Sequence, residues 1–124
     1  MSRVFAVQQP TGRDRDTGAI RPTMDLTPAT EFGELRFILR DYHHPFRDPT
    51  GTAAEVRRVL EVEDFGPTDW LLLVGNPSLI GIVAAQASVI TGGRLRLLQW
   101  DRPRHRYRPL EAQLSGLDPI PGSS

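Results

Sequence analysis

The sequence predicts an α/β domain with a three- to five-stranded, mostly parallel, Rossmann-like sheet, two main helices and a C-terminal antiparallel hairpin strand. Residues 69–75 form a continuous apolar run, as in strands that are covered on both faces. A helical pattern then fills residues 77–91, and residues 94–100 return as a strand, which is the spacing of a right-handed βαβ crossover. A chain of 124 residues holds one core, so we expect one domain over residues 1–114 and a flexible tail over residues 115–124.

The N-terminal part of the chain supplies two further strands. Residues 3–9 are rich in β-branched and aromatic side chains and stop at a proline, as a strand does. Residues 11–24 mix glycine, proline and alternating charges, which predicts a polar loop. Residues 27–30 combine a capping hydroxyl with a first-turn proline, which predicts one or two helical turns before Gly33. Residues 34–40 alternate as a strand, with one face formed by Leu35, Phe37 and Leu39.

The first main helix is predicted between two loops. Residues 41–51 are rich in proline, histidine and aspartate and predict a loop. Thr52 and Glu55 have the spacing of a capping box, so we expect a helix that starts there and runs to about Glu63.

The second main helix, over residues 77–91, has clear ends and an unusual composition. Asn76 is a typical N-cap residue, Pro77 suits the first helical position, and two glycines at 92–93 favour a left-handed stop. The helix is apolar nearly all round and must be covered on most sides, although one sheet covers one side only. We therefore expect a homo-oligomer formed through this helix. Its small side chains form one stripe, made of Ser78, Gly81, Ala85 and Ser88.

Composition excludes several kinds of chemistry. The chain has no cysteine and no lysine, so disulfides, thiolate zinc sites, Schiff bases and P-loops are excluded. All fifteen basic residues are arginines, which follows either from GC-rich coding or from selection of guanidinium groups for phosphate and carboxylate contacts. Three histidines without metal-ligand spacing give no reason to expect a metal or a cofactor. Without a long apolar run or a signal sequence, we expect a cytoplasmic protein with no membrane partner.

Charge and topology together predict a ligand-binding edge. The net charge is zero, but residues 25–69 are acidic and residues 94–108 are basic. In an open parallel sheet, ligands bind beyond the carboxyl ends of the strands. If the strands at 34–40, 69–75 and 94–100 are neighbours, their loops converge beside the positive end of the 77–91 helix, which favours an anion. The residues expected to contribute are Arg40, His43, His44, Arg47, Asn76, Ser78 and Arg102.

A second candidate site is a basic hairpin. Residues 106–114 can pair back antiparallel across a turn near residues 102–105. A two-residue period would place four arginines on one face, where they could hold a nucleic-acid backbone while Trp100 or Tyr107 stacks on a base. The plainer alternative is a solvated turn that protects a sheet edge. The four arginines are Arg102, Arg104, Arg106 and Arg108.

Most of the chain resembles a set of short proteins encoded by tailed bacteriophages. The likeness lies in residues 69–81, 92–102 and 107–110, and the segments at 4–10 and 25–35 also fit. The resemblance implies a phage or prophage origin and hence the host cytoplasm, where small accessory proteins often modulate host machinery. It brings no activity and no catalytic residue.

These observations favour a non-enzymatic accessory protein that binds a phosphate-bearing ligand, either nucleic acid or a nucleotide. The alternative is a protein-interaction module that inhibits or modulates a host factor, as anti-defence proteins do. A small nuclease or nucleotide hydrolase ranks last, because no nucleophile elbow, glycine-rich nucleotide motif or recognised acid–histidine spacing is present.

Overall fold

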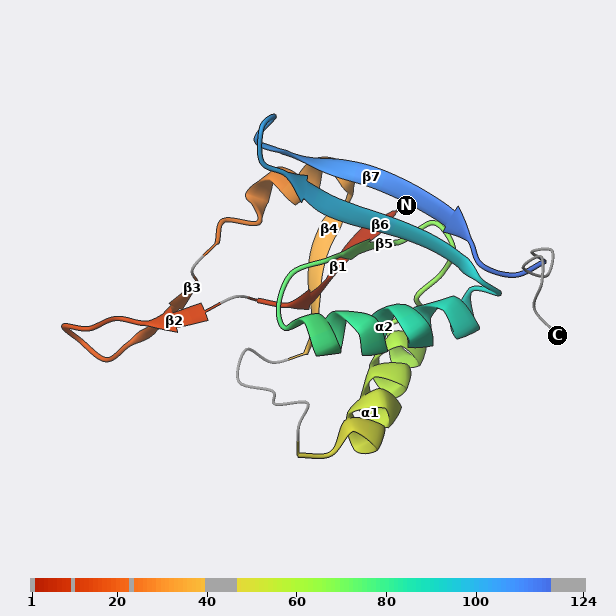
Figure 1. The fold of residues 1–124 in the computed structure, drawn as a ribbon, viewed down its shortest axis with the longest axis horizontal. Coiled ribbons are helices and arrows are strands. Elements are labelled where there is room, and N and C mark those ends of the chain that lie inside the picture. The colour runs from red at the N-terminus through yellow and green to blue at the C-terminus, as the bar shows by residue number, and fades with distance from the viewer. Residues whose placement is uncertain (1, 10, 23, 40–46, 117–124) are drawn as a thin grey trace, which may run out of the picture.

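The computed structural model describes residues 2–9, 11–22, 24–39 and 47–116. Its body is a mixed five-stranded sheet with two α-helices, as the sequence predicts (Figure 1). The sheet contains β1 (Arg3–Gln8), β4 (Glu34–Leu39), β5 (Trp70–Leu72), β6 (Arg94–Asp101) and β7 (Arg106–Gln113). The other elements are α1 (Pro49–Val62), α2 (Pro77–Ile90), the short strands β2 (Thr11–Arg13) and β3 (Ile20–Pro22), and the 3-10 helix η1 (Thr27–Phe32).

The strand order is β4-β1-β5-β6-β7. The first four of these strands are parallel, and β7 pairs antiparallel with β6, as predicted. The condition set for the predicted site, that the strands at 34–40, 69–75 and 94–100 are neighbours, is met only for the last two. The β1 strand lies between β4 and β5, and its Val4 pairs with both Leu35 and Trp70. The four parallel strands nevertheless end at one edge of the sheet, which we call the carboxyl edge.

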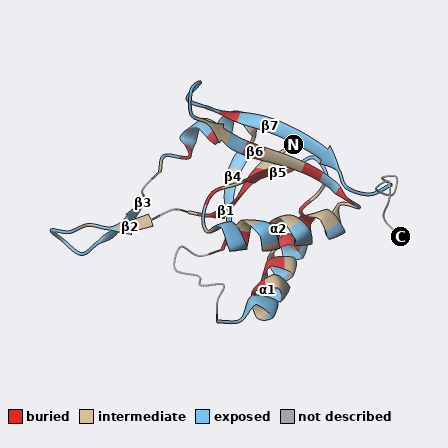
Figure 2. Ribbon diagram, viewed as in Figure 1, coloured by how far each residue is buried: buried red, intermediate tan, exposed pale blue. Residues whose placement is uncertain are grey.

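The two faces of the sheet are covered differently (Figure 2). Along β1, Phe5 and Val7 face the helices, whereas Val4 and Ala6 face the segment of residues 24–32. All four side chains are fully buried, which is why this strand is apolar without a break. The helix face also contains Val56, Leu60, Leu71, Leu79 and Val83, and the opposite face contains Leu26, Ala29, Leu72, Leu98 and Tyr107.

The three parallel crossovers share one hand. The connections from β4 to β5 through α1 and from β5 to β6 through α2 move the same way across the sheet, over the same face. The connection from β1 to β4 moves the opposite way and passes over the opposite face with η1. Reversing both direction and face preserves the hand, as expected when strand twist sets the handedness of every crossover.

Both helices begin with a side-chain cap, although the first cap differs from the prediction. Asp48 caps α1, since its Oδ1 accepts the N–H of Gly51 at 2.9 Å. The capping box predicted at Thr52 is wrong, because Thr52 lies inside the helix and is buried. Asn76 caps α2 as predicted, and Gly92 and Gly93 follow its end with positive φ angles of 70° and 91°.

The polar loop predicted over residues 11–24 is wrong, because β2 and β3 form an antiparallel hairpin there. Asp14 closes its turn: the Oδ1 atom accepts the N–H of Asp16 at 2.7 Å, and Gly18 adopts a φ of 71°. The capping hydroxyl predicted at Thr27 is also wrong. The N-cap of η1 is Leu26, without a side-chain cap, while the backbone N–H of Thr27 donates to the Asp25 carboxylate at 2.9 Å.

The α2 helix is covered by more than the sheet. It packs against α1, where Arg57 Nε donates to Gln86 Oε1 at 2.9 Å. The reasoning that only the sheet covers this helix is therefore wrong. Its outward side carries exposed small residues and Val89, whose side chain is 61% exposed. Within the ranges described above, no helix is long and apolar enough to cross a membrane.

Candidate functional site

Some of the residues predicted to form the strand-end site are described by the structure and some are not. Arg40, His43 and His44 lie outside the described residues. Arg47 is exposed directly before the Asp48 cap of α1. The predicted residues that the structure describes are therefore Arg47, the two at the start of α2, Asn76 and Ser78, and Arg102.

The start of α2 is largely occupied by the chain itself. Asn76 Oδ1 accepts the N–H of Ser78 at 2.8 Å, and Pro77 has no N–H to offer. Gln8 comes from the end of β1, is buried, and its Oε1 accepts the N–H of Asn76 at 3.3 Å. A Cβ at Gly75 would lie 2.7 Å from that of Gln8, so the crevice between β1 and β5 is filled. The helix start is thus a weaker anion site than its sequence predicts.

The turn between β6 and β7 exposes four arginines at the carboxyl edge. Arg104 Nη1 pairs with Asp101 Oδ2 at 3.1 Å, and Arg106 lies 3.9 Å from the carboxylate of Glu31 on η1. Arg102 and Arg108 are exposed and make no ion pair within the described part of the chain. Because residues 102–105 form a turn, the expected two-residue period holds only for Arg106 and Arg108.

The arginines at the tip of this hairpin act on Asp101, which is the one carboxylate of residues 101–108. Burial works to raise the pKa of Asp101, but hydrogen bonds from Arg104 and the charges of Arg104 and Arg108 lower that pKa below its usual value. Asp101 therefore stays ionised, and its negative charge offsets the positive charge of Arg104. The arginines remain in excess over carboxylates at the tip.

The aromatic residues of the hairpin are structural. Tyr107 is 1% exposed and packs edge-on against Trp100, with ring centroids 5.0 Å apart. Burial, and then the negative charge of Asp25, raises the pKa of Tyr107 above its usual value. A base cannot stack on Tyr107 in this arrangement. Trp100 is half-buried and also packs edge-on against His105, at 6.3 Å.

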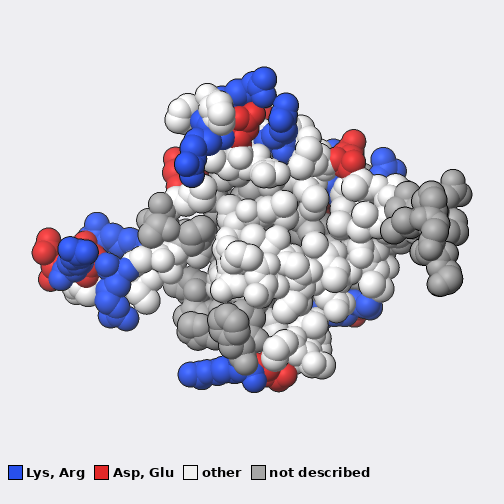
Figure 3. Space-filling view, in the orientation of Figure 1, with Lys and Arg blue, Asp and Glu red and all other residues white. Residues whose placement is uncertain are grey.

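A second arginine-bearing hairpin lies at the same edge, and sequence reasoning missed it. The β2–β3 hairpin begins three residues after β1 ends and projects from the body of the fold (Figure 1). It carries Arg13, Arg15 and Arg21 against two aspartates, and Figure 3 shows its basic groups as a cluster apart from that of the β6–β7 turn. Arg21 lies 3.7 Å from Asp14. The Asp14–Gly18 turn was the signal that could have revealed it.

The predicted pocket requires the turn that carries Arg102 to meet the start of α2, and in the described part of the chain these two do not meet (Figure 1). The β6–β7 turn and the start of α2 are well separated in Figure 1, since the two elements lie toward opposite faces of the sheet. The hairpin instead lines a separate shallow cavity of about 250 Å³ with Asp101, Arg104, Arg106 and Arg108. In the described part of the chain, no three histidine, aspartate or glutamate side chains are grouped to hold a metal ion.

Fold and site together define a small mixed α/β domain whose carboxyl edge bears two hairpins with exposed arginines. Residues 2–114 match the family described as Phage Pam3 gp32-like protein, and the chain belongs to this family. The resemblance to phage proteins is therefore confirmed. No curated protein and no solved structure matches the chain.

Proposed function

We propose that this phage protein is a non-enzymatic accessory protein that binds nucleic acid through the phosphate backbone, with the β6–β7 hairpin as its main contact. The observation that carries the proposal is the excess of exposed guanidinium groups at the tip of that hairpin. Four arginines follow one another at alternate positions, and Asp101 is the one carboxylate among them. One guanidinium group can donate two parallel hydrogen bonds to a phosphate. Each phosphate that is neutralised in this way releases condensed counterions, so binding weakens as salt rises.

The shape of the site favours a polymer over a free nucleotide. Nucleotide sites are concave and gather polar groups around a bound molecule. Here Arg102 lies in the turn and Arg108 near the start of β7, and both are exposed. The amide groups at the start of α2 are partly used by Asn76. Exposed arginines at the tip of a hairpin can contact successive phosphates of a nucleic-acid backbone that lies across the tip. The β2–β3 hairpin offers three further arginines at the same edge.

A protein-interaction module that modulates a host factor is the second candidate. The outward side of α2 favours it, because Val89 is 61% exposed beside the small residues Gly81 and Ala85. Such a surface would bind an apolar protein face, with little dependence on salt. The homo-oligomer expected through this helix stays a prediction.

Salt dependence of binding to a labelled single-stranded oligonucleotide, measured by fluorescence anisotropy, tests the proposal. The affinity should fall as salt rises, and removing two backbone contacts in Arg102→Gln/Arg108→Gln should lower the slope of log K against log salt by about 1.4. The matched control is Arg58→Gln/Arg94→Gln, which removes two exposed arginines from α1 and from the opposite end of β6. Equal slopes in both double variants, or no binding at low salt, would refute nucleic-acid binding by this hairpin.

A further inference from the structure

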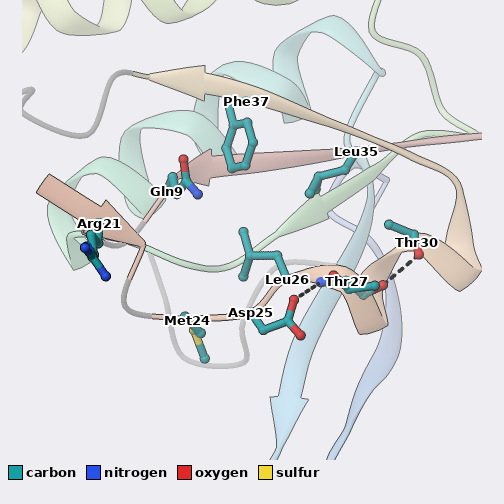
Figure 4. Close-up of a pocket in the computed structure, with 9 residues that line it drawn as sticks. All are labelled: Gln9, Arg21, Met24, Asp25, Leu26, Thr27, Thr30, Leu35 and Phe37. Atoms are coloured by element: carbon teal, nitrogen blue, oxygen red, sulfur yellow. Dashed lines mark hydrogen bonds between the residues drawn. The ribbon is translucent and has the colours of Figure 1, made fainter. Parts of the chain in front are cut away.

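An open groove of about 680 Å³ lies beside the carboxyl end of β4, on the sheet face away from the helices (Figure 4). Its floor and walls are mostly apolar, formed by Leu35 and Phe37 of β4 and by Leu26. Polar groups lie around it: Gln9 follows β1, Arg21 comes from β3, and Asp25 precedes η1. The volume is that of a small-molecule site.

One aromatic ring in the groove, that of Phe37, is partly exposed to solvent. The η1 segment covers the middle of this sheet face, where Ala29 is fully buried, but it stops short of the end of β4. Phe37 therefore remains 43% exposed, while the next residue, Ile38, is buried against the helices. An exposed ring in an apolar groove is a surface on which a flat molecule can stack.

The Asp25 carboxylate at this groove is held in place and kept charged. Its Oδ1 accepts the backbone N–H of Thr27 at 2.9 Å. Hydrogen bonds from the side chain and the backbone of Thr27 lower the pKa of Asp25 below its usual value. An ionised carboxylate accepts hydrogen bonds and donates none. A bound molecule must therefore present N–H or O–H donors to it.

The groove lies between the two hairpins. Arg21 of the β2–β3 hairpin is one of its lining residues. On the other side, the segment that carries Asp25 also carries Glu31, which lies 3.9 Å from Arg106 of the β6–β7 hairpin. The charge of Asp25 also reaches Tyr107. A nucleic-acid strand whose phosphates contacted both hairpins would pass over the groove.

We propose that the groove binds one unpaired base of a single-stranded nucleic acid, and that this base is guanine. The inference rests on the proposed function. A base would stack on Phe37 between the apolar walls and present its edge to Asp25. Guanine carries two adjacent donors on its Watson–Crick edge, N1–H and the N2 amino group, and the two oxygens of a carboxylate can accept both. Adenine and cytosine each offer the exocyclic amino group alone.

Mononucleotides test the groove separately from the backbone contacts, with binding followed by amide NMR shifts. Guanosine 5′-monophosphate should shift the amides of residues 25–27 and 35–37. Inosine 5′-monophosphate, which lacks the N2 amino group, should bind several-fold more weakly. Asp25→Asn should weaken the guanine nucleotide about tenfold or more, since an amide nitrogen then faces donors. Glu55→Gln, which removes the same charge from the exposed side of α1, should leave its affinity unchanged.

The outcomes separate this inference from the proposed function. If the oligonucleotide binds with its salt slope but the guanine nucleotide leaves the groove amides unshifted, the base site is refuted and backbone binding stands. Equal affinity for the guanine, inosine and adenine nucleotides would refute selection by Asp25. If Phe37→Leu, which keeps the groove apolar, binds the guanine nucleotide as tightly as the unchanged protein, stacking is refuted. Failure of both the oligonucleotide and the nucleotide to bind would refute both proposals.

Discussion

Replacing Asp69 by asparagine should strongly destabilise the fold. Asp69 is 4% exposed and its carboxylate accepts four hydrogen bonds. Oδ1 accepts from the backbone N–H of Arg3 at 3.0 Å and from its Nε at 3.4 Å. Oδ2 accepts from Nη2 of Arg3 at 3.1 Å and from the N–H of Gly66 at 2.9 Å. This carboxylate therefore joins the start of β1 to the loop before β5.

The size of the loss follows from which contacts survive. Asparagine keeps one acceptor oxygen but turns an N–H₂ group toward two donors, so one pair of hydrogen bonds becomes repulsive. Breaking a buried ion pair from one side costs about 3–5 kcal/mol. The Arg3 side chain is 24% exposed and keeps its bonds to the carbonyls of Glu63 and Asp64, so we expect the lower end, about 3 kcal/mol.

Urea denaturation followed by tryptophan fluorescence measures this loss, since Trp70 is buried in the core. With a denaturant dependence of about 1.5 kcal/mol/M, the midpoint should fall by roughly 2 M. The midpoint of thermal unfolding should fall by roughly 12 °C. Asp16→Asn, on the exposed tip of the β2–β3 hairpin, should change stability by less than about 0.5 kcal/mol. A loss below about 1 kcal/mol for Asp69→Asn would refute the reasoning.

Three other parts of the fold can be tested in the same way. Burial and the charge of Asp25 raise the pKa of Tyr107, so stability should be full below pH 10, the usual value, and fall as the pH rises toward the folded-state pKa. In a pH titration followed by tyrosinate absorbance, one tyrosine should ionise above pH 10, and Tyr107→Phe should remove this step. The same variant should be as stable as the unchanged protein or more so, because the buried hydroxyl has no partner among the described residues; a loss above about 1 kcal/mol would contradict this. Asp48→Ala should cost about 1 kcal/mol of helix capping, measured by urea denaturation, and no loss would show that Asp48 is not the cap. Gly75→Ala, at a φ of 112°, should cost about 2 kcal/mol, whereas Gly81→Ala in an open helix position should gain up to about 1 kcal/mol; equal effects would refute the strain at Gly75.

The sequence predicted the elements whose signals are local. The apolar run at 69–75 does contain a strand, although β5 covers only Trp70–Leu72 of it. The start of α2 at Asn76–Pro77 and the positive φ angles of the glycines at 92–93 are as expected. The antiparallel pairing of β7 was predicted from a short polar turn between two alternating segments. In these places backbone preference and burial act in the same direction.

Features that depend on distant contacts were not predicted. Nothing in residues 3–9 says that β1 lies between β4 and β5, because that place is set by pairing with residues 30 and more positions away. The sequence predicts a loop where β2 and β3 form a hairpin, because these short, mostly polar strands show no alternating apolar face. The spacing of Thr52 and Glu55 fits a capping box, but Asp48, four residues earlier, caps the helix instead.

The candidate site was predicted in composition but not in shape. The arginines at 102–108 do lie together at the carboxyl edge, as expected from chain order. Their separation from Asn76 depends on which face of the sheet each element covers, which single-sequence patterns do not encode. The groove beside Phe37 combines Gln9, Arg21, the segment of residues 24–30 and β4, and no motif spacing could have indicated it.

Mapping the surface that nucleic acid contacts tests the central claim most directly. A short guanine-containing single-stranded oligonucleotide is titrated into isotope-labelled protein at low salt, and amide shifts are followed by NMR. Shifts concentrated in residues 13–37 and 101–108 are the expected result, and added salt should reverse them. Shifts confined to the outward side of α2, or none at all, would contradict binding at the two hairpins.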